Sequence, residues 1–177
     1  ALGHRRLSII DLTHYGHQPM SSSDHRYWVV YNGEIYNFPV LKSQLQTKGH
    51  VFRTRNDTEV LLHLWEEHRE KCLPLLNGMF AFAIYDRVEN VLTLARDRFG
   101  VKPLYYAVSG GLLLFGSEIK ALLASGLLPA EIHTSAVAEY FTFQNIFGSQ
   151  TLFKNVHLLP PGEFLQLRPE SGDVSGT

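Results

Sequence analysis

Cysteine is almost absent from this sequence of 177 residues, in which Cys72 is the only one. A single cysteine cannot form an intramolecular disulfide, which is typical of a reducing compartment, and we expect a cytoplasmic location. No run of about 18 apolar residues occurs, so no membrane-spanning helix is expected. The first residues include His4, Arg5 and Arg6 rather than the apolar stretch of a signal peptide, so no secretion signal is expected.

An excess of charge is also lacking. The formal net charge is -1 and charged residues make up 19% of the chain. This balance gives no reason to expect a nucleic-acid partner or an anionic membrane surface. Hydrophobic residues make up 45%, which predicts a packed core in one domain of ordinary size.

Both ends of the chain suggest a piece of a longer protein. The sequence starts at Ala1 without a methionine, and residues 175–177 form a small polar tail. We expect one domain over residues 1–170 and the start of a linker over residues 171–177.

Strand patterns dominate the sequence. Residues 79–85 and 91–95 are apolar runs separated by residues 86–90, which predicts a hairpin with a five-residue loop. Another strand is expected at residues 27–31. Strands joined by short loops pair in antiparallel fashion.

A second hairpin is expected further along. Residues 104–108 and 112–115 flank the sequence Ser-Gly-Gly at residues 109–111. The hairpin strands are apolar on both faces, which fits a sheet covered on both sides.

Helices separate these strands. One is expected to begin after Asn37 and stop at Gly49. Asn56 and Glu59 resemble a capping box at the start of the next, which is expected to run until Pro74. Its apolar face carries Val60, Leu61, Leu64, Trp65, His68 and Cys72.

Two more helices are expected at residues 118–123 and 135–143. The aromatic residues Phe141, Phe143 and Phe147 are expected in the core. Antiparallel strands with amphipathic helices predict an α+β layered domain.

Asn32 and Gly33 have two interpretations. One is a type I′ turn between two strands. The other is an oxyanion hole, in which the Gly33 N–H and the Asn32 amide donate to a developing negative charge. Two such donors serve amide hydrolysis and are worth about 3 kcal/mol each in the transition state.

Three further charged residues complete a pocket suited to a free amino acid. Arg6 is either a surface residue at a strand end or a ligand-binding residue whose guanidinium donates two charge-assisted hydrogen bonds to an α-carboxylate. Asp57 either suits the dipole of a helix start or anchors an α-ammonium group, which Glu34 could help orient. The side-chain amide of such a ligand would then face Asn32 and Gly33.

The other candidate residues carry less chemistry. Cys72 is expected to be a buried structural thiol and a poor nucleophile. The nine histidines give no metal set: His14 and His17 lie three apart in a loop without companion ligands. Tyr105 and Tyr106, with Arg96 and Asp97, either contact a following domain or form a paired strand with a buried ion pair.

Eight segments together resemble the class II glutamine amidotransferase domain of glutamine-hydrolysing asparagine synthetases. They cover almost the whole chain in the same order. Other class II amidotransferases share the short Asn-Gly element, whereas ARDRFGVKPLYY and GMFAFAIYD resemble the asparagine synthetase branch more closely. The segments are HRRLSIID (4–11), QPM (18–20), YNGEIYN (31–37), NDTEV (56–60), LNGMFAFAIYD (76–86), ARDRFGVKPLYY (95–106), GSEIKALL (116–123) and LLPPGEFL (158–165).

The resemblance implies a fold and a set of roles. The fold would be a four-layer αββα sandwich of the N-terminal-nucleophile hydrolase type, with antiparallel sheets. Arg6 would bind the α-carboxylate of L-glutamine, Asn32 and Gly33 would form the oxyanion hole, and Glu34 and Asp57 would contact the α-amino end. The same pocket would be lined by the backbone of Leu7, Ser8, Ile9 and Ile10.

The resemblance also implies a parent enzyme. That enzyme would hydrolyse glutamine through a cysteinyl thioester and pass ammonia to a C-terminal synthetase domain that converts aspartate to asparagine. ATP and Mg²⁺ are expected in that domain, and no cofactor is expected in this one. A homodimer is compatible with the family.

One departure from the family is large. Its nucleophile is an N-terminal cysteine, whereas this sequence has Ala1, which aligns with an internal position. We therefore expect a truncated domain that does not hydrolyse glutamine alone. The alternatives are a glutamine-binding module without catalysis, or an amidotransferase domain serving another acceptor.

Overall fold

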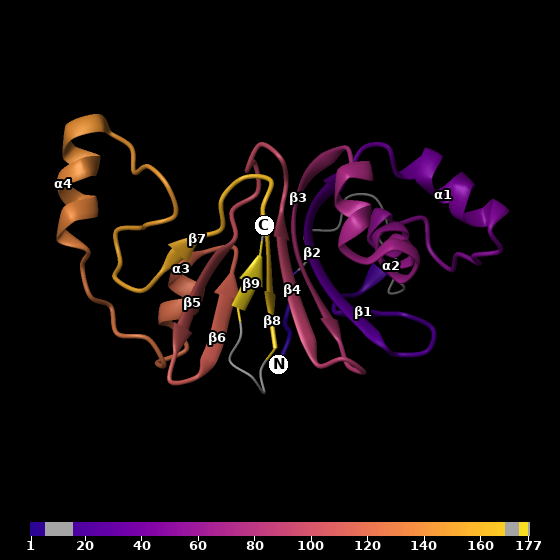
Figure 1. Ribbon diagram of the computed structural model, residues 1–177, viewed down its shortest axis with the longest axis horizontal. Coiled ribbons are helices and arrows are strands. Elements are labelled where there is room, and N and C mark those ends of the chain that lie inside the picture. Colours follow the sequence, from indigo (N-terminus) through magenta and orange to yellow (C-terminus); the bar gives the residue numbers. More distant parts are fainter. Residues whose placement is uncertain (6–15, 169–173, 177) are drawn as a thin grey trace.

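The computed structural model describes residues 1–5, 16–168 and 174–176. Its elements stack in four layers: helices α1 and α2, a six-stranded sheet, a three-stranded sheet, and helix α3 (Figure 1). All strand pairs within these residues are antiparallel. The αββα sandwich expected from the sequence is therefore confirmed.

The six-stranded sheet has the order β1-β2-β3-β4-β8-β9, and the three-stranded sheet has the order β6-β5-β7. The pairing of β2 with β3 is the longest in the molecule's described part, with nine residue pairs. The strands are β1 Met20–Ser21, β2 Tyr27–Ile35, β3 Gly78–Asp86, β4 Val91–Arg96, β5 Tyr105–Ser109, β6 Leu112–Gly116, β7 His157–Leu158, β8 Phe164–Leu167 and β9 Val174–Gly176.

Both predicted hairpins are present. The β3–β4 loop is one residue shorter than expected, because Asp86 already pairs with Val91. In the β5–β6 hairpin only Gly110 and Gly111 lie between the strands, and both have positive φ, at 57° and 77°. A two-residue turn with positive φ at both positions matches the strand twist, which explains the glycines.

The turn interpretation of Asn32-Gly33 is wrong. Both residues lie inside β2, where Asn32 is paired with Ala81 and Gly33 with Phe80. A Cβ at Gly33 would lie 2.7 Å from the Cα of Phe80, so glycine is required for this close approach of strands. Asn-Gly favours turns, but here the two residues lie within a run of nine residue pairs between β2 and β3. This long pairing overrides the local preference.

Helix α1 (Phe38–Thr47) begins and ends as expected. Asn37 is the N-terminal flanking residue, but its side chain makes no capping hydrogen bond. Its amide instead donates to the Leu75 carbonyl at 2.9 Å and accepts from the Asn77 N–H at 2.9 Å. Gly49 follows the helix with φ of 95°.

Helix α2 (Asp57–His68) starts with half of the expected capping box. The Asn56 side chain accepts from the Thr58 N–H at 3.1 Å. The Glu59 carboxylate does not return to Asn56 but accepts from the N–H groups of Arg53 and Thr54, at 2.8 and 2.7 Å. Glu59 thus fastens the connection before the helix to its first turn.

Helix α2 ends earlier than the sequence predicts, at His68 instead of Pro74. The helix ends at His68, because Arg69 has φ of 52°, and residues Arg69–Leu75 form a 3-10 helix that contains Pro74 and Cys72. Arg69 donates to the Asp86 carboxylate at 2.6 Å, and this ion pair ties the break to the end of β3.

Two hydrophobic clusters cover the two faces of the six-stranded sheet. One joins β2 and β3 to α1 and α2 and includes Trp65 and Phe82, whose rings meet edge to face at 6.1 Å. The other lies between the two sheets and includes Ala83 and Leu94. The expectation of a sheet covered on both sides is confirmed. A third cluster places α3 (Ile119–Leu123) on the outer face of the three-stranded sheet.

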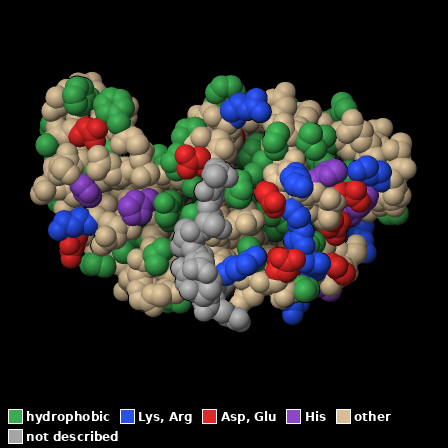
Figure 2. Space-filling view, viewed as in Figure 1, with side chains coloured by type: hydrophobic (Ala, Val, Ile, Leu, Met, Phe, Trp, Pro, Cys, Tyr) green, Lys and Arg blue, Asp and Glu red, His purple; other side chains and the backbone are tan. Residues whose placement is uncertain are grey.

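Helix α4 (Thr134–Phe143) projects from the body of the molecule (Figure 1). Figure 2 shows hydrophobic side chains gathered on this projection. Phe141 is 81% exposed, Phe143 61% and Phe147 55%, so the expectation that they lie in the core is wrong. Only Ala136 of α4 is buried.

Arg96 and Asp97 serve the backbone rather than each other. The Arg96 guanidinium donates to the carbonyls of Lys102, Gly100 and Leu159 at 2.6–2.7 Å. A buried ion pair between them, part of one of the two interpretations, is not among the ion pairs of the described residues. Their role is to shape the segment after β4.

Asp97 is fully buried and accepts from the backbone N–H groups of Phe80, Phe99, Val101 and Lys102 at 3.0–3.2 Å. Burial alone would raise the pKa of this carboxyl, but the backbone donors outweigh burial and hold the pKa below its usual value.

In the described part of the chain, no helix is long and apolar enough to cross a membrane.

Candidate functional site

The candidate site lies on the edge of β2 that faces away from β3. Two backbone N–H groups at this edge are held by side chains: Tyr31 donates to Gln18 Oε1 at 2.6 Å, and Ile35 donates to Asp57 Oδ2 at 3.0 Å. In an antiparallel strand, alternate residues direct their N–H groups to the same edge. The N–H of Gly33 therefore points to this edge, between the two.

Among the residues that the structure describes, no strand pairs with this edge of β2 at the level of Gly33. Strand β1 pairs with β2 only through Met20↔Val29 and Ser21↔Trp28, four or more residues before Gly33. Phe80, opposite Gly33, exchanges its own N–H and carbonyl with Asp97, on the other side of β3. Gly33 and Phe80 therefore form a non-hydrogen-bonded pair, which is the closer kind of pair and accounts for the need for glycine.

Asn32 and Glu34 lie on one face of β2, because side chains alternate along a strand. Their neighbours Tyr31 and Ile35 point the other way, into the cluster under α1 and α2. The Asn32 side chain is exposed and Glu34 is half-buried. An amide and a carboxylate are thus displayed beside the Gly33 N–H.

Asp57 reaches the same edge from the first turn of α2. It is 2% exposed, and its Oδ2 accepts from the Tyr31 hydroxyl at 2.7 Å as well as from Ile35. Burial and the neighbouring Asp57 carboxylate raise the pKa of the Tyr31 hydroxyl, which stays a neutral donor. The structure therefore brings Asn32, Gly33, Glu34 and Asp57 to one strand and its edge.

The sequence predicts a role at this site for neither Gln18 nor Asn56. Gln18 holds the Tyr31 N–H, although nothing in the spacing of thirteen residues indicates such a contact. Asn56 was assigned only as a cap, yet its Nδ2 is buried without a hydrogen-bond partner among the described residues. This amide donor lies next to Asp57 in the chain.

The predicted α-carboxylate site falls outside the described residues. Arg6, Leu7, Ser8, Ile9 and Ile10 all belong to residues 6–15. Their roles stay predictions.

Cys72 is not suited to nucleophilic attack. It is 0% exposed, and burial raises the pKa of its thiol to about 12. The thiol lies in the cluster under α1 and α2, as the sequence predicts.

Two recesses lie away from these groups. One, of about 320 Å³, is lined by Gly78 and Phe80 of β3 together with Arg98 and Phe99. The other, of about 290 Å³, surrounds Asp86 near the β3–β4 turn. Neither is lined by the four candidate residues, which lie along the edge of β2.

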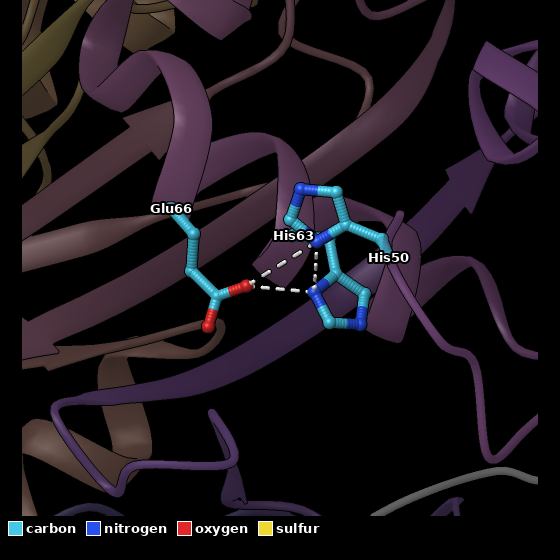
Figure 3. A group of neighbouring side chains, drawn as sticks. All are labelled: His50, His63 and Glu66. Atoms are coloured by element: carbon cyan, nitrogen blue, oxygen red, sulfur yellow. Dashed lines mark hydrogen bonds and ion pairs between the residues drawn. The ribbon is translucent and has the colours of Figure 1, made fainter. Parts of the chain in front are cut away.

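A second polar group sits on the outer helical layer. His50, His63 and Glu66 point toward one another (Figure 3), with potential ligand atoms within 4.8 Å of one another. His63 and Glu66 come from α2, and His50 follows α1. The sequence does not predict this group, because thirteen residues separate His50 from His63.

Comparison with known proteins gives consistent relatives. Residues 1–175 match a family described as a glutamine amidotransferase domain. Glutamine-hydrolysing asparagine synthetase 1 of Bacillus subtilis is 42% identical over 173 residues, which cover 98% of this chain and 27% of that protein. Glutamine-hydrolysing asparagine synthetase 3 of the same organism is 45% identical over 141 residues, covering 78% of this chain and 23% of that protein.

A relative with a different name is also similar. Amidase chyE of Penicillium rubens is 38% identical over 168 residues, covering 95% of this chain and 24% of that protein. The chain thus spans about a quarter of the length of these relatives.

Solved structures show the same fold. Glutamine phosphoribosylpyrophosphate amidotransferase from B. subtilis, complexed with ADP and GMP, has a TM-score of 0.64 at 23% identity, covering 93% of this chain and 32% of that one. This likeness supports the αββα arrangement. The match over residues 1–175 and the identities to the asparagine synthetases together show that the chain belongs to the glutamine amidotransferase domain family.

Proposed function

We propose that this chain is the glutamine-binding part of an asparagine synthetase that releases ammonia for the ATP-dependent conversion of aspartate to asparagine. The observation that carries this proposal is the Gly33 N–H on the edge of β2, where no strand of the described residues pairs at this level. The N–H groups on either side of it, those of Tyr31 and Ile35, donate to Gln18 and Asp57. Family membership and the names of the relatives support the substrate.

Each candidate residue has a role in the proposal. The Gly33 N–H and the Asn32 amide receive the oxyanion formed from the glutamine side-chain amide. Asp57 already uses Oδ2 for Tyr31 and Ile35, and we assign its Oδ1, with Glu34, to the α-ammonium group. Arg6 is assigned to the α-carboxylate.

The proposed reaction needs a thiolate. Its attack on the amide carbon forms a C–S bond and a tetrahedral oxyanion, whose collapse breaks the C–N bond as the nitrogen takes a proton and leaves as ammonia. Water then hydrolyses the thioester to glutamate and restores the thiol. Cys72 is buried and protonated, so we assign attack to the N-terminal cysteine that the family resemblance implies for the full-length protein.

We further propose an ammonia-using synthetase domain as the partner, with ATP and Mg²⁺ acting there and not in this chain. The relatives extend far beyond the matched part. The exposed aromatic surface of α4 and of the residues that follow it, formed by Tyr140, Phe141, Phe143 and Phe147, supports contact with that remainder, because contiguous apolar surface marks interaction sites. A cytoplasmic location and a homodimer belong to the same proposal.

Ammonia release by the full-length protein that contains this chain tests the proposal. Asn32→Ala is expected to lower kcat for glutamine hydrolysis about 100- to 1000-fold, since one oxyanion donor is lost. The exposed Asn145, beyond α4, gives a matched control in Asn145→Ala. Activity of Asn32→Ala within threefold of the control would contradict the assignment.

Two alternatives predict different results. A glutamine-binding module without catalysis would give calorimetric heat with glutamine and no ammonia from the full-length protein. An amidotransferase with another acceptor would release ammonia but leave aspartate unchanged, and the similarity to amidase chyE makes this the alternative to check by product analysis.

A further inference from the structure

The cluster of His50, His63 and Glu66 has the dimensions of a metal site. The Nδ1 atoms of His50 and His63 are 3.1 Å apart, Glu66 Oε2 is 2.6 Å from His63 Nδ1, and it is 4.0 Å from His50 Nδ1 (Figure 3). Bonds of about 2.0–2.1 Å to a tetrahedral Zn²⁺ ion place ligand atoms about 3.3 Å apart. The three separations bracket that value.

Glu67 orients the His50 ring. The Nε2 of His50 and Oε1 of Glu67 are 3.0 Å apart, and Lys48 Nζ holds the other Glu67 oxygen at 3.0 Å. A neutral His50 that donates from Nε2 presents an unprotonated Nδ1 to His63 and Glu66. Metal-binding histidines are held in this way, with the second ring nitrogen donating to a carboxylate.

Hydrogen bonding inside the cluster satisfies only part of it. With His50 Nδ1 unprotonated, the single Nδ1 proton of a neutral His63 can be given to Glu66 or to His50, but not in good geometry to both. One acceptor atom is then left facing the lone pair of another acceptor. Little water is available to compensate, because the side chains of His50, His63 and Glu66 are only 16%, 11% and 24% exposed. A cation accepts all three lone pairs.

We propose that His50 Nδ1, His63 Nδ1 and Glu66 Oε2 bind a divalent transition-metal ion, for which Zn²⁺ is the best match, with water as the fourth ligand. Two imidazoles and one carboxylate suit Zn²⁺ better than Mg²⁺ or Ca²⁺, which prefer oxygen ligands. The site is separate from the β2 edge and independent of the glutaminase proposal.

The ion would join two parts of the outer layer. His50 lies in the connection between α1 and α2, and the other two ligands lie on α2. The same connection is fastened by Glu59 to Arg53 and Thr54 and leads into Asp57. Bound metal is therefore expected to raise the thermal unfolding midpoint, because an ion that binds only the folded state stabilises it.

Binding of Zn²⁺ to the full-length protein, prepared without a histidine tag, tests this proposal by competition with a chromophoric chelator. One equivalent per chain is expected from this site. Co²⁺ in place of Zn²⁺ is expected to give the intense visible absorption of a tetrahedral ion. His63→Gln and His50→Gln should each weaken affinity at least tenfold and abolish the Co²⁺ spectrum.

Two variants sharpen the test. Glu67→Gln leaves all three ligands in place and is expected to weaken Zn²⁺ affinity about 10- to 100-fold through the orientation of His50. His68→Gln changes a histidine of the same helix outside the cluster and should leave affinity and spectrum unchanged.

Circular dichroism of each variant establishes folding. If His63→Gln does not fold, His50→Gln and Glu67→Gln still decide the question, since both residues are partly exposed. The proposal is overturned if folded wild-type protein binds no Zn²⁺, or if its affinity is the same in His50→Gln and His68→Gln, which would leave a hydrogen-bonded cluster only.

Discussion

Helices α2 and α4 carry similar apolar patterns and have opposite surroundings. In α2, Val60, Leu61 and Trp65 are at most 2% exposed, because the helix lies between α1 and the six-stranded sheet. In α4, Tyr140 is 46% exposed and Phe141 81% exposed, and the helix projects from the three-stranded sheet (Figure 1). Apolar periodicity identifies both helices, but only the neighbouring layer decides whether that face forms core.

The difference separates two uses of apolar surface. The face of α2 holds Asp57 against β2 and so positions the candidate site. On α4, Tyr140, Phe141 and Phe143 stay exposed in the described chain, and we assign this face to contact with a partner domain. Substitutions in α2 should therefore mainly lower the free energy of unfolding. Substitutions on the exposed face of α4 should mainly change how much asparagine the full-length protein forms per glutamate.

Trp65→Ala should give the largest effect on stability. Its ring is buried and contacts Phe82 edge to face, so removal leaves a cavity under α2 and should cost about 3–5 kcal/mol in the free energy of unfolding. Urea unfolding measures this. Trp28→Ala, at a half-buried position of β2, is the matched control and should cost less. Equal losses in the free energy of unfolding for the two variants would contradict the account that the α2 interface is the more tightly packed region.

Gly33→Ala should have the next largest effect, about 3 kcal/mol, at the upper end for overpacking. The added Cβ would meet the Phe80 backbone at 2.7 Å, and backbone cannot rotate away. Gly3→Ala adds a Cβ that meets nothing within 4 Å and serves as control. Thermal unfolding of both variants, with glutamine hydrolysis, should show loss only for Gly33→Ala.

Asp97→Asn should cost about 2 kcal/mol at neutral pH, because charge-assisted bonds to four backbone N–H groups are lost. The pKa of Asp97 is lower in the folded state than the ordinary value of 3.8, so its contribution is present above that pH and is lost as the pH falls below it.

Unfolding measured from pH 7 to pH 2 should thus show the gap between wild type and Asp97→Asn narrowing below about pH 4. A gap that stays constant to pH 2 would show that the ionised carboxylate is not the cause.

Phe141→Ser should have the smallest effect on stability, within about 0.5 kcal/mol, because the ring is already exposed. In the full-length protein it should leave glutamine hydrolysis intact and lower the amount of asparagine formed per glutamate. Ser135→Ala, at the start of the same helix, is the control. An unchanged product ratio would remove α4 from the proposed interface.

Local chemistry explains which parts of the fold the sequence predicts. The β5–β6 turn is specified by Gly110 and Gly111, whose positive φ few other residues adopt, and α2 begins where Asn56 caps it. Such signals act within a few residues. They predict the strands, the helices and the hairpins.

Long-range contacts explain the errors. Asn32-Gly33 reads locally as a turn, but pairing with β3 holds it in a strand. The break at Arg69 is held by Asp86, seventeen residues away, and the exposure of Phe141 depends on the absence of a described layer over α4. The grouping of Asn32, Gly33 and Glu34 with Asp57 rests on complementary chemistry for a free amino acid and on family resemblance, because spacing alone does not place α2 at the edge of β2.

The most direct measurement is the response of the Gly33 amide to glutamine, followed by NMR of the full-length protein with ¹⁵N-labelled glycine and asparagine. Binding is expected to shift the Gly33 N–H and the Asn32 side-chain amide, while Gly3 and Asn145 remain unchanged. Saturating glutamine that shifts neither Gly33 nor Asn32 would contradict the assignment of the β2 edge as the glutamine site.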